Sequence, residues 1–257
     1  MKKITLVKLG GSIITDKQTA YLARLDVIRR LAKELKCCPD SLIIAHGSGS
    51  FGHVSAVKFG GKKGYKSKEG FAKVALDAME INQIVMNSLV GQKIPAVSFK
   101  PMSMIVASSG KMDSSFFEPV NQALLQGFIP VVYGDGILDR QWKSTIFSGE
   151  TTLSKIGMYF KDQGYTINKI IEVGETDGVY DDKKQTIKTI SKTSWPKIKQ
   201  FIFSSNRSDV TGGMEHKIEE ALRMAKVGIE TIIINGNRKN ELQKALLNKQ
   251  VKGTVIK

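Results

Sequence analysis

Cysteine is scarce in this 257-residue sequence: only Cys37 and Cys38 occur, and they are adjacent. Neighbouring cysteines rarely bond to each other, and the spacing of a four-ligand zinc site is absent. A chain of this length buries a sizeable core without such cross-links. We therefore expect two free thiols in a reducing compartment, which excludes a disulfide-stabilised scaffold.

Long apolar runs are missing as well. The run Ile4–Val7 ends at Lys8, well short of the apolar region of a secretory signal peptide. No stretch approaches the roughly 20 apolar residues that a membrane span needs. These patterns predict a cytoplasmic protein without a membrane-spanning segment.

Acidic and aromatic residues are also few. The chain has 24 Asp and Glu against 39 Lys and Arg, a formal net charge of +15, and only 7% aromatic residues. A nucleic-acid-binding protein clusters its basic side chains and interleaves them with aromatic ones. Here the lysines are spread over the whole chain, with one dense run at Lys58–Lys68. The pattern favours a site for small anions over a nucleic-acid partner.

Short apolar runs rich in Ile and Val alternate with longer amphipathic stretches along the chain. This alternation predicts an α/β fold with a mostly parallel sheet and helices on both of its faces. No repeat or low-complexity linker divides the chain, so we expect one domain with two lobes at most. The expected strands are Ile4–Leu9, Leu42–Ala45, Ala96–Phe99, Pro130–Tyr133, Lys169–Val173, Thr231–Ile234 and Gly253–Ile256. The expected helices are Leu25–Lys36, Glu69–Val90, Pro119–Gln126, Thr151–Asp162, Glu215–Val227 and Glu241–Leu247.

Two glycine-rich segments imitate nucleotide-binding motifs. Lys62–Ser67 is not a Walker loop, because Tyr65 stands where that motif requires glycine. Gly47–Gly52 does satisfy Gly-x-Gly-x-x-Gly directly after an expected strand. A dinucleotide site also needs an immediate helix and a second strand that ends in an acidic residue. The chain instead runs into Lys58–Lys68 with no strand expected before Glu69, which argues against a dinucleotide-dependent dehydrogenase.

Two other segments place a lysine near a glycine pair. In Lys8–Ser12 a strand ends in lysine, and the glycines that follow let backbone N–H groups approach a phosphate. Lys17 adds a further cation a few residues later. In Asp209–Lys217 the glycine pair leads into a helix, whose N-terminus favours an anion. Because the carboxyl ends of parallel strands share one edge of the sheet, these segments predict a phosphate-binding site there.

Taken together, these segments resemble the amino acid kinase superfamily and, more narrowly, the isopentenyl phosphate kinases. The most specific feature is His53 at the end of the second glycine loop, which the superfamily usually lacks there. In kinases of small phosphomonoesters this histidine contacts the acceptor phosphate. The matching segments occur in family order and span essentially the whole chain: Lys8–Lys17, His46–His53, Ile94–Ser98, Pro130–Asp135, Ser148–Gly149, Thr176–Tyr180 and Asp209–Gly213 with Lys217.

The resemblance implies the amino acid kinase fold, a three-layer α/β/α sandwich with a mostly parallel open sheet. It implies a single domain over residues 1–257, with an acceptor-binding lobe to about residue 165 and a nucleotide-binding lobe from about residue 166. It further implies ATP and Mg²⁺ as cofactors, a small phosphorylated isoprenoid as substrate, and a homodimer. No residue of the chain is assigned as a metal ligand.

The resemblance also implies a role for each matching residue. Lys17 would stabilise the transferring phosphoryl group, and Asp135 would orient the lysines. The implied nucleotide-binding residues are Lys8, Gly10, Gly11, Ser12, Gly49, Glu175, Tyr180, Gly213 and Lys217. The implied acceptor-binding residues are Ser48, His53 and Gly149. Within the apolar stripe of the expected helix Glu69–Val90, Phe71 and Val74 lie nearest the basic run and are the candidates for a pocket around the isoprenoid tail.

Three positions depart from the family pattern. Ser48 stands where glycine is usual, and Glu150 stands where aspartate is usual after Ser-Gly. The segment Glu175–Tyr180 is a reduced form of Thr-Asp-x-Asp-Gly-Val-Tyr. These departures bear on the nucleotide geometry and on the acceptor more than on the fold or the reaction.

Three functions are therefore compared. The first is ATP-dependent phosphorylation of isopentenyl phosphate to isopentenyl diphosphate. The second keeps the fold but changes the acceptor to another small phosphomonoester or a phosphonate such as fosfomycin. The third is a non-catalytic protein that binds nucleotide or nucleic acid through the same basic surface, and the presence of Lys8, Lys17 and Lys217 together argues against it.

Overall fold

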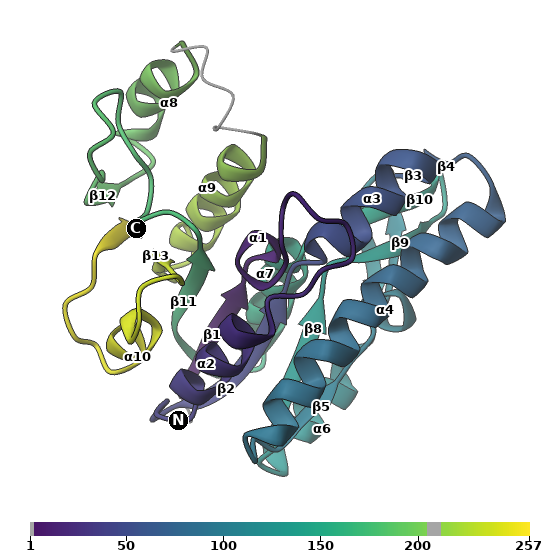
Figure 1. The fold of residues 1–257 in the computed structure, drawn as a ribbon, viewed down its shortest axis with the longest axis horizontal. Helices are drawn as coiled ribbons and strands as arrows, with labels where there is room; N and C mark the ends of the chain where they lie inside the picture. Colours follow the sequence, from purple (N-terminus) through teal and green to yellow (C-terminus); the bar gives the residue numbers. More distant parts are fainter. Residues whose placement is uncertain (1–2, 205–211) are drawn as a thin grey trace.

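The computed structural model describes residues 3–204 and 212–257. At its centre lies an eight-stranded sheet with the order β12-β14-β13-β11-β1-β2-β8-β5 (Figure 1). The pairings in this sheet are parallel except for the one between β13 and β14. Its strands are β1 (Lys3–Leu9), β2 (Ser41–His46), β5 (Ala96–Ser98), β8 (Ile129–Tyr133), β11 (Thr166–Gly174), β12 (Thr189–Ile190), β13 (Thr231–Asn235) and β14 (Gly253–Ile256).

Strand β1 runs through the middle of this sheet, between β2 and β11. Its apolar sequence suits a central parallel strand, which is covered on both faces. Successive side chains of a strand point to opposite faces, so Lys8 shares a face with Leu6, while Val7 and Leu9 point to the other. The strand therefore places the side chain of Lys8 on a face of the sheet that helices cover.

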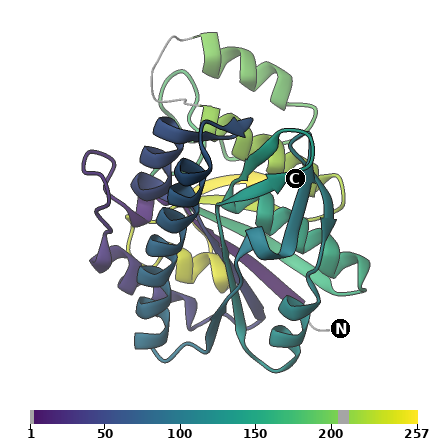
Figure 2. The same cartoon turned by 90° about the vertical axis from the view of Figure 1, so that its right-hand side faces the viewer.

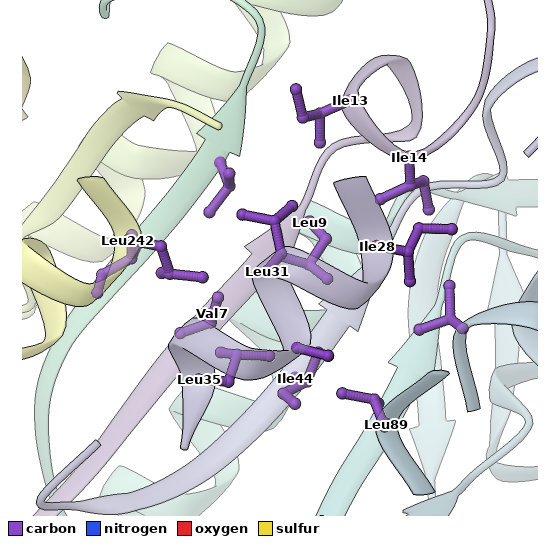
Figure 3. Close-up of a cluster of buried hydrophobic side chains, with 14 of the residues drawn as sticks. Val7, Leu9, Ile13, Ile14, Ile28, Leu31, Leu35, Ile44, Leu89 and Leu242 are labelled. Carbon is purple, nitrogen blue, oxygen red and sulfur yellow. The ribbon is translucent and has the colours of Figure 1, made fainter. Parts of the chain in front are cut away.

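Helices cover both faces of the sheet (Figures 1 and 2). On one face Val7 and Leu9 pack with side chains of α2, α4 and α10 in a buried apolar cluster (Figure 3). On the other face Leu6 packs with side chains of α6, α7 and α9. The predicted three-layer α/β/α sandwich is thus confirmed. The helices are α1 (Gly11–Ile14), α2 (Leu25–Leu35), α3 (Gly49–Phe59), α4 (Lys68–Gly91), α5 (Pro101–Met104), α6 (Glu118–Leu125), α7 (Gly149–Asp162), α8 (Trp195–Ser204), α9 (Gly212–Ala225) and α10 (Glu241–Leu246).

Every expected strand and helix is present, with small differences at the ends. None of the helices in the described part of the chain is long and apolar enough to cross a bilayer. A second, four-stranded sheet with the order β10-β9-β6-β7 was not predicted. Its most exposed strand, β7, reads Lys-Met-Asp-Ser-Ser and offers no apolar alternation. The strands are β6 (Ile105–Ser108), β7 (Lys111–Ser115), β9 (Asp135–Asp139) and β10 (Lys143–Phe147).

The segment after the second glycine loop also differs from the prediction. Helix α3 begins at Gly49, and a short hairpin of β3 (Gly60–Gly61) and β4 (Gly64–Tyr65) follows it before α4. The sequence did not predict this helix. Its buried positions include Gly52 and Ser55, so apolar residues do not recur there at helical spacing. The hairpin forms its own two-stranded sheet. Because it adds no strand to the main sheet, a dinucleotide-binding unit is still excluded.

Candidate active site

The two glycine loops that follow β1 and β2 lie in direct backbone contact. Gly10 N donates a hydrogen bond to Val173 O at 2.8 Å, which joins the first loop to the end of β11. A Cβ added to Gly11 would lie only 2.5 Å from Gly49 N of the second loop. The lack of side chains therefore lets both loops meet at the carboxyl ends of the strands, where parallel sheets bind ligands.

Gly11→Ala is expected to lower the free energy of unfolding by about 1–3 kcal/mol, because the added methyl group overpacks the contact with Gly49. Thermal unfolding measures the effect. Gly91→Ala is the matched control, since an added Cβ at the end of α4 meets no neighbouring group within 4 Å. If both variants unfold at the wild-type temperature, the two loops do not depend on this close contact.

Helix α7 begins against the second glycine loop. Ser148 caps the helix, because its Oγ accepts a hydrogen bond from a backbone N–H of the first turn at 3.1 Å. A Cβ on Gly149 would lie 2.6 Å from His46 O, so a larger residue has no room there. The next residue, Glu150, is thereby placed on the face of the sheet that carries Lys8.

Lys8 is held between two glutamates. Its Nζ donates a hydrogen bond to Glu150 Oε1 and lies 3.7 Å from Glu172 Oε2. Glu172 is adjacent because β1 and β11 pair with Lys8 opposite Glu172. All three side chains are buried. Since charged groups are seldom buried without a partner or a task, this cluster marks the candidate site.

Lys217 belongs to the same electrostatic cluster. Its Nζ lies 3.9 Å from the position that a Cβ on Gly174 would take, at the carboxyl end of β11. The charge of Lys8, followed by burial, lowers the pKa of Lys217. Burial would also lower the pKa of Lys8, but Glu150 and Glu172 hold it above its ordinary value. An anion that binds beside the glycine loop would offset the repulsion between the two ammonium groups and so stabilise their charged forms.

The pKa of Glu150 is lowered in this cluster. Burial opposes its ionisation, yet the charges of Lys8 and Lys217 outweigh that effect. Glu150 therefore remains an anion that fixes Lys8 by a charge-assisted hydrogen bond.

The helix that carries Lys217 begins earlier than expected. Helix α9 starts at Gly212, so the exposed Gly213 lies within its first turn and Lys217 follows about one turn later. The preceding part of the motif, Asp209–Thr211, lies outside the described residues.

Lys17 lies on the segment that follows α1 and pairs with Glu175. Lys17 Nζ contacts Glu175 Oε2, and Arg24 Nη1 lies 3.8 Å from Glu175 Oε1. The Lys17 side chain is 66% exposed. Exposed ion pairs contribute little stability, so replacing this partner by another anion would cost little free energy.

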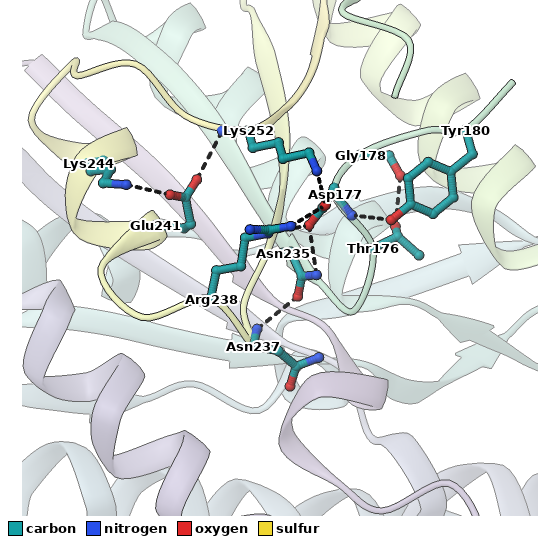
Figure 4. A network of polar contacts seen from close by, with 10 residues as sticks. All are labelled: Thr176, Asp177, Gly178, Tyr180, Asn235, Asn237, Arg238, Glu241, Lys244 and Lys252. Carbon is teal, nitrogen blue, oxygen red and sulfur yellow. Dashed lines mark hydrogen bonds and ion pairs between the residues drawn. The ribbon is translucent and has the colours of Figure 1, made fainter. Parts of the chain in front are cut away.

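Tyr180 belongs to a polar network that fixes the loop after β11 (Figure 4). Its hydroxyl accepts a hydrogen bond from Asp177 N at 3.0 Å. The Asp177 carboxylate accepts two hydrogen bonds of 2.6 Å from Arg238 and one of 2.9 Å from Asn235, and Lys252 Nζ lies 2.9 Å away. Arg238 is the main cause of a strongly lowered Asp177 pKa. The network ties Tyr180 to β13 and to the C-terminal segment.

Asp135 has partners that the sequence did not predict. Its carboxylate accepts hydrogen bonds from Met102 N at 3.2 Å and from Gly136 N at 2.9 Å. Burial raises the pKa of Asp135 to about 6, against the opposing effect of these donors and of Lys100. The carboxylate that contacts Lys8 is instead that of Glu150. A role of Asp135 in orienting the lysines therefore stays a prediction, without support from its contacts.

The remaining predicted residues lie at the starts of helices. Ser48 is half-buried directly before α3, and His53 is exposed in the second turn of that helix. Ser12 is half-buried in α1. The structure thus places Ser48 on the second glycine loop and His53 on the helix that follows it, and this loop contacts the start of α7 through His46 and Gly47.

Glu150 and Glu172 are the two candidate residues that sequence reasoning missed. Glu150 was noted only as a replacement for the usual aspartate. Glu172 stands in the strand Ile170-Ile171-Glu172-Val173. A single acidic residue inside a buried apolar strand is the local signal that could have marked it, although it does not show which residue Glu172 faces.

Comparisons with known proteins identify the family of the chain. Residues 3–235 match the model of the amino acid kinase family. The isopentenyl phosphate kinases of Methanocaldococcus jannaschii and Methanothermobacter thermautotrophicus are 34% and 32% identical to the chain, each over 98% of both sequences. X-ray structures of isopentenyl phosphate kinase superpose with a TM-score of 0.82 at 30% identity, covering 98% of this chain and 100% of the other. The chain belongs to the amino acid kinase family, and its similarity groups it there with the isopentenyl phosphate kinases.

Proposed function

We propose that this protein transfers the γ-phosphoryl group of ATP to isopentenyl phosphate and so forms isopentenyl diphosphate and ADP. The observation that carries the proposal is the pair of ammonium groups, Lys8 and Lys217, beside glycine loops in contact at the carboxyl ends of β1 and β2. Relatives with at least 30% identity over nearly the whole chain are isopentenyl phosphate kinases. Neither another acceptor nor a non-catalytic role is favoured by these similarities.

The proposed nucleotide site centres on the buried cluster. Lys8 and Lys217 would contact the phosphates of ATP, and Glu150 would hold Lys8 in place. The full proposed set is Lys8, Gly10, Gly11, Ser12, Gly49, Glu175, Tyr180, Gly213 and Lys217. The proposed acceptor residues are Ser48, His53 and Gly149. In this proposal the acceptor lobe ends near residue 165 and the nucleotide lobe begins near residue 166, where β11 starts.

The reaction suits these residues because it needs little acid–base help. A phosphate monoester has its second pKa near ~6, so at neutral pH it is mostly a dianion and already nucleophilic. Phosphoryl transfer depends on positioning and on stabilising charge on the transferring group. Lys17 would supply that stabilisation by leaving Glu175 for the transferring phosphoryl group.

Mg²⁺ is proposed to enter with ATP. Proteins usually hold this ion through substrate phosphates and one or two carboxylates, not in an all-protein cage. In the described ranges, no group of three or more His, Cys, Asp or Glu side chains is placed to hold a metal ion. The bound ion would neutralise part of the phosphate charge.

A coupled ATP-turnover assay tests the proposed function. We expect ADP release to be fastest with isopentenyl phosphate, compared with dimethylallyl phosphate, fosfomycin and uridine monophosphate. A preference for fosfomycin or uridine monophosphate would reassign the acceptor. Absence of turnover together with salt-dependent binding of duplex nucleic acid would support the non-catalytic alternative.

Phe71 and Val74 are proposed to limit the length of the isoprenoid tail. Both are buried in α4, and the Phe71 ring stacks on Tyr65 with centroids 5.3 Å apart. The double variant Phe71→Ala with Val74→Ala is expected to raise kcat/KM for geranyl phosphate by at least about 10-fold. A single methylene group of a substrate already changes kcat/KM by about that factor when an apolar pocket has to accommodate it. Leu76→Ala, at an exposed position of the same helix, should leave the preference unchanged. If a folded double variant still rejects geranyl phosphate, another segment sets the limit.

The homodimer and the cytoplasmic location expected from the sequence stay predictions. Sedimentation of the purified chain tests the first, and cell fractionation tests the second.

A further inference from the structure

Glu172 has no task in the proposed function, although it belongs to the buried cluster. Its side chain is 9% exposed, and Glu172 Oε2 lies 3.7 Å from Lys8 Nζ. That distance is too long for a hydrogen bond, and Oε2 has no hydrogen-bond partner within the described part of the chain. A buried carboxylate oxygen without a donor disfavours the ionised form.

The elements around Glu172 bring three charged groups toward it. Strand β1 presents Lys8, α7 presents Glu150 and α9 presents Lys217, while the neighbour on β13 is the apolar Ile233. Burial raises the pKa of Glu172 to about 7, against the opposing effect of Lys8. With all four groups ionised the cluster is neutral, and protonation of Glu172 gives it a net positive charge.

We propose that Glu172 takes up a proton from solvent when the phosphates of MgATP enter beside Lys8 and Lys217, and returns it when the nucleotide leaves. This inference rests on the proposed function, which puts the phosphates at these two lysines. An ionised Glu172 would repel the phosphates and compete with them for the Lys8 ammonium. A neutral Glu172 removes that repulsion and leaves Glu150 as the single anion that positions Lys8.

The direction of the pH dependence follows from this linkage. Nearby phosphates favour the neutral carboxyl, so the pKa of Glu172 is higher in the complex than in the free protein. Binding is then tightest below the pKa of the free protein. It weakens as pH rises through that value, by up to about 10-fold per pH unit.

The experiment measures MgATP binding without acceptor by calorimetry, at several values between about pH 6.5 and 8.5. Saturating Mg²⁺ keeps the nucleotide phosphates deprotonated over this range. Two buffers with different ionisation enthalpies report the protons that the wild-type protein takes up, which needs no variant. Glu172→Gln is the test variant, and Glu34→Gln is the control, since Glu34 is a buried carboxylate bonded to Arg30 and to Asn240 N.

We expect the wild-type dissociation constant to rise at least about 10-fold across this range, with proton uptake that approaches one per nucleotide. Glu172→Gln should bind with a nearly constant affinity and without proton uptake, while Glu34→Gln should follow the wild type. Deprotonation of Lys217 would also weaken binding at high pH, but that effect would persist in Glu172→Gln.

Two results overturn the inference. One is that the wild type binds MgATP without proton uptake. The other is that the dissociation constant changes equally with pH in the wild type and in Glu172→Gln. Absence of MgATP binding at every pH would instead remove the proposed function, so the two failures are distinguishable.

Discussion

Lys17→Met is expected to lower kcat by roughly 10²–10³-fold, the scale for losing one contact that stabilises charge in a transition state. The KM values for ATP and acceptor should change much less, because the contact forms mainly as the phosphoryl group moves. The structure is consistent with this expectation, since Lys17 is exposed and forms a surface ion pair with Glu175. Steady-state kinetics of the folded variant measure the effect.

The control for this prediction is Lys111→Met, which removes an exposed lysine from β7 of the second sheet. Its kcat should equal that of the wild type. The comparison distinguishes a local effect of Lys17 from the effect of removing one positive charge elsewhere on the surface. Near-normal turnover in Lys17→Met would remove Lys17 from the mechanism.

His53→Ala is expected to lower kcat/KM for the phosphate acceptor by about 10- to 150-fold, the cost of losing a hydrogen bond to a charged group. His53 is exposed on α3, one turn after the glycine loop, and an imidazole N–H can donate a hydrogen bond to an anion. The KM for ATP should remain nearly unchanged. Initial rates over a range of acceptor concentrations provide the measurement.

His53→Gln serves as the matched variant, because glutamine keeps an N–H donor and should recover part of the loss. Equal damage to ATP and acceptor binding in His53→Ala, with no recovery in His53→Gln, would mean that the histidine only shapes the loop.

Most of the main sheet was predictable, because strands such as β1, β2 and β8 are buried on both faces and read as short apolar runs. Strand β11 shows this pattern clearly, with Ile170, Ile171 and Val173 all buried. The two-residue edge strand β12 was not predicted. The second sheet was not predictable, because β7 is exposed and polar at most positions and because β9 and β10 carry polar residues at buried positions. Helix α3 was not predicted for a different reason, since glycine and serine accompany Phe51 at its buried positions and leave no apolar periodicity.

The site was predictable where it depends on local sequence. Glycine pairs near lysines indicated the loop at Gly11 and the start of α9 at Gly213 without knowledge of the fold. The two glutamates of the cluster could not be predicted from the sequence, because strand pairing and helix packing bring Glu150 and Glu172 to Lys8. Glu172 lies opposite Lys8 by the register of β1 and β11, and no local pattern encodes that register.

The position of β1 has a consequence for how the chain folds. Its partner on one side, β2, ends at His46, but its partner on the other side, β11, begins only at Thr166. Pairing over such a separation is slow, and an unpaired strand edge readily joins other chains. While the chain is being synthesised, one edge of β1 stays open until β11 has emerged, which makes the first two thirds of translation the stage most prone to aggregation. ATP binds only after that pairing, so added nucleotide is expected to raise the yield of refolded protein by stabilising the final state, without accelerating the pairing itself.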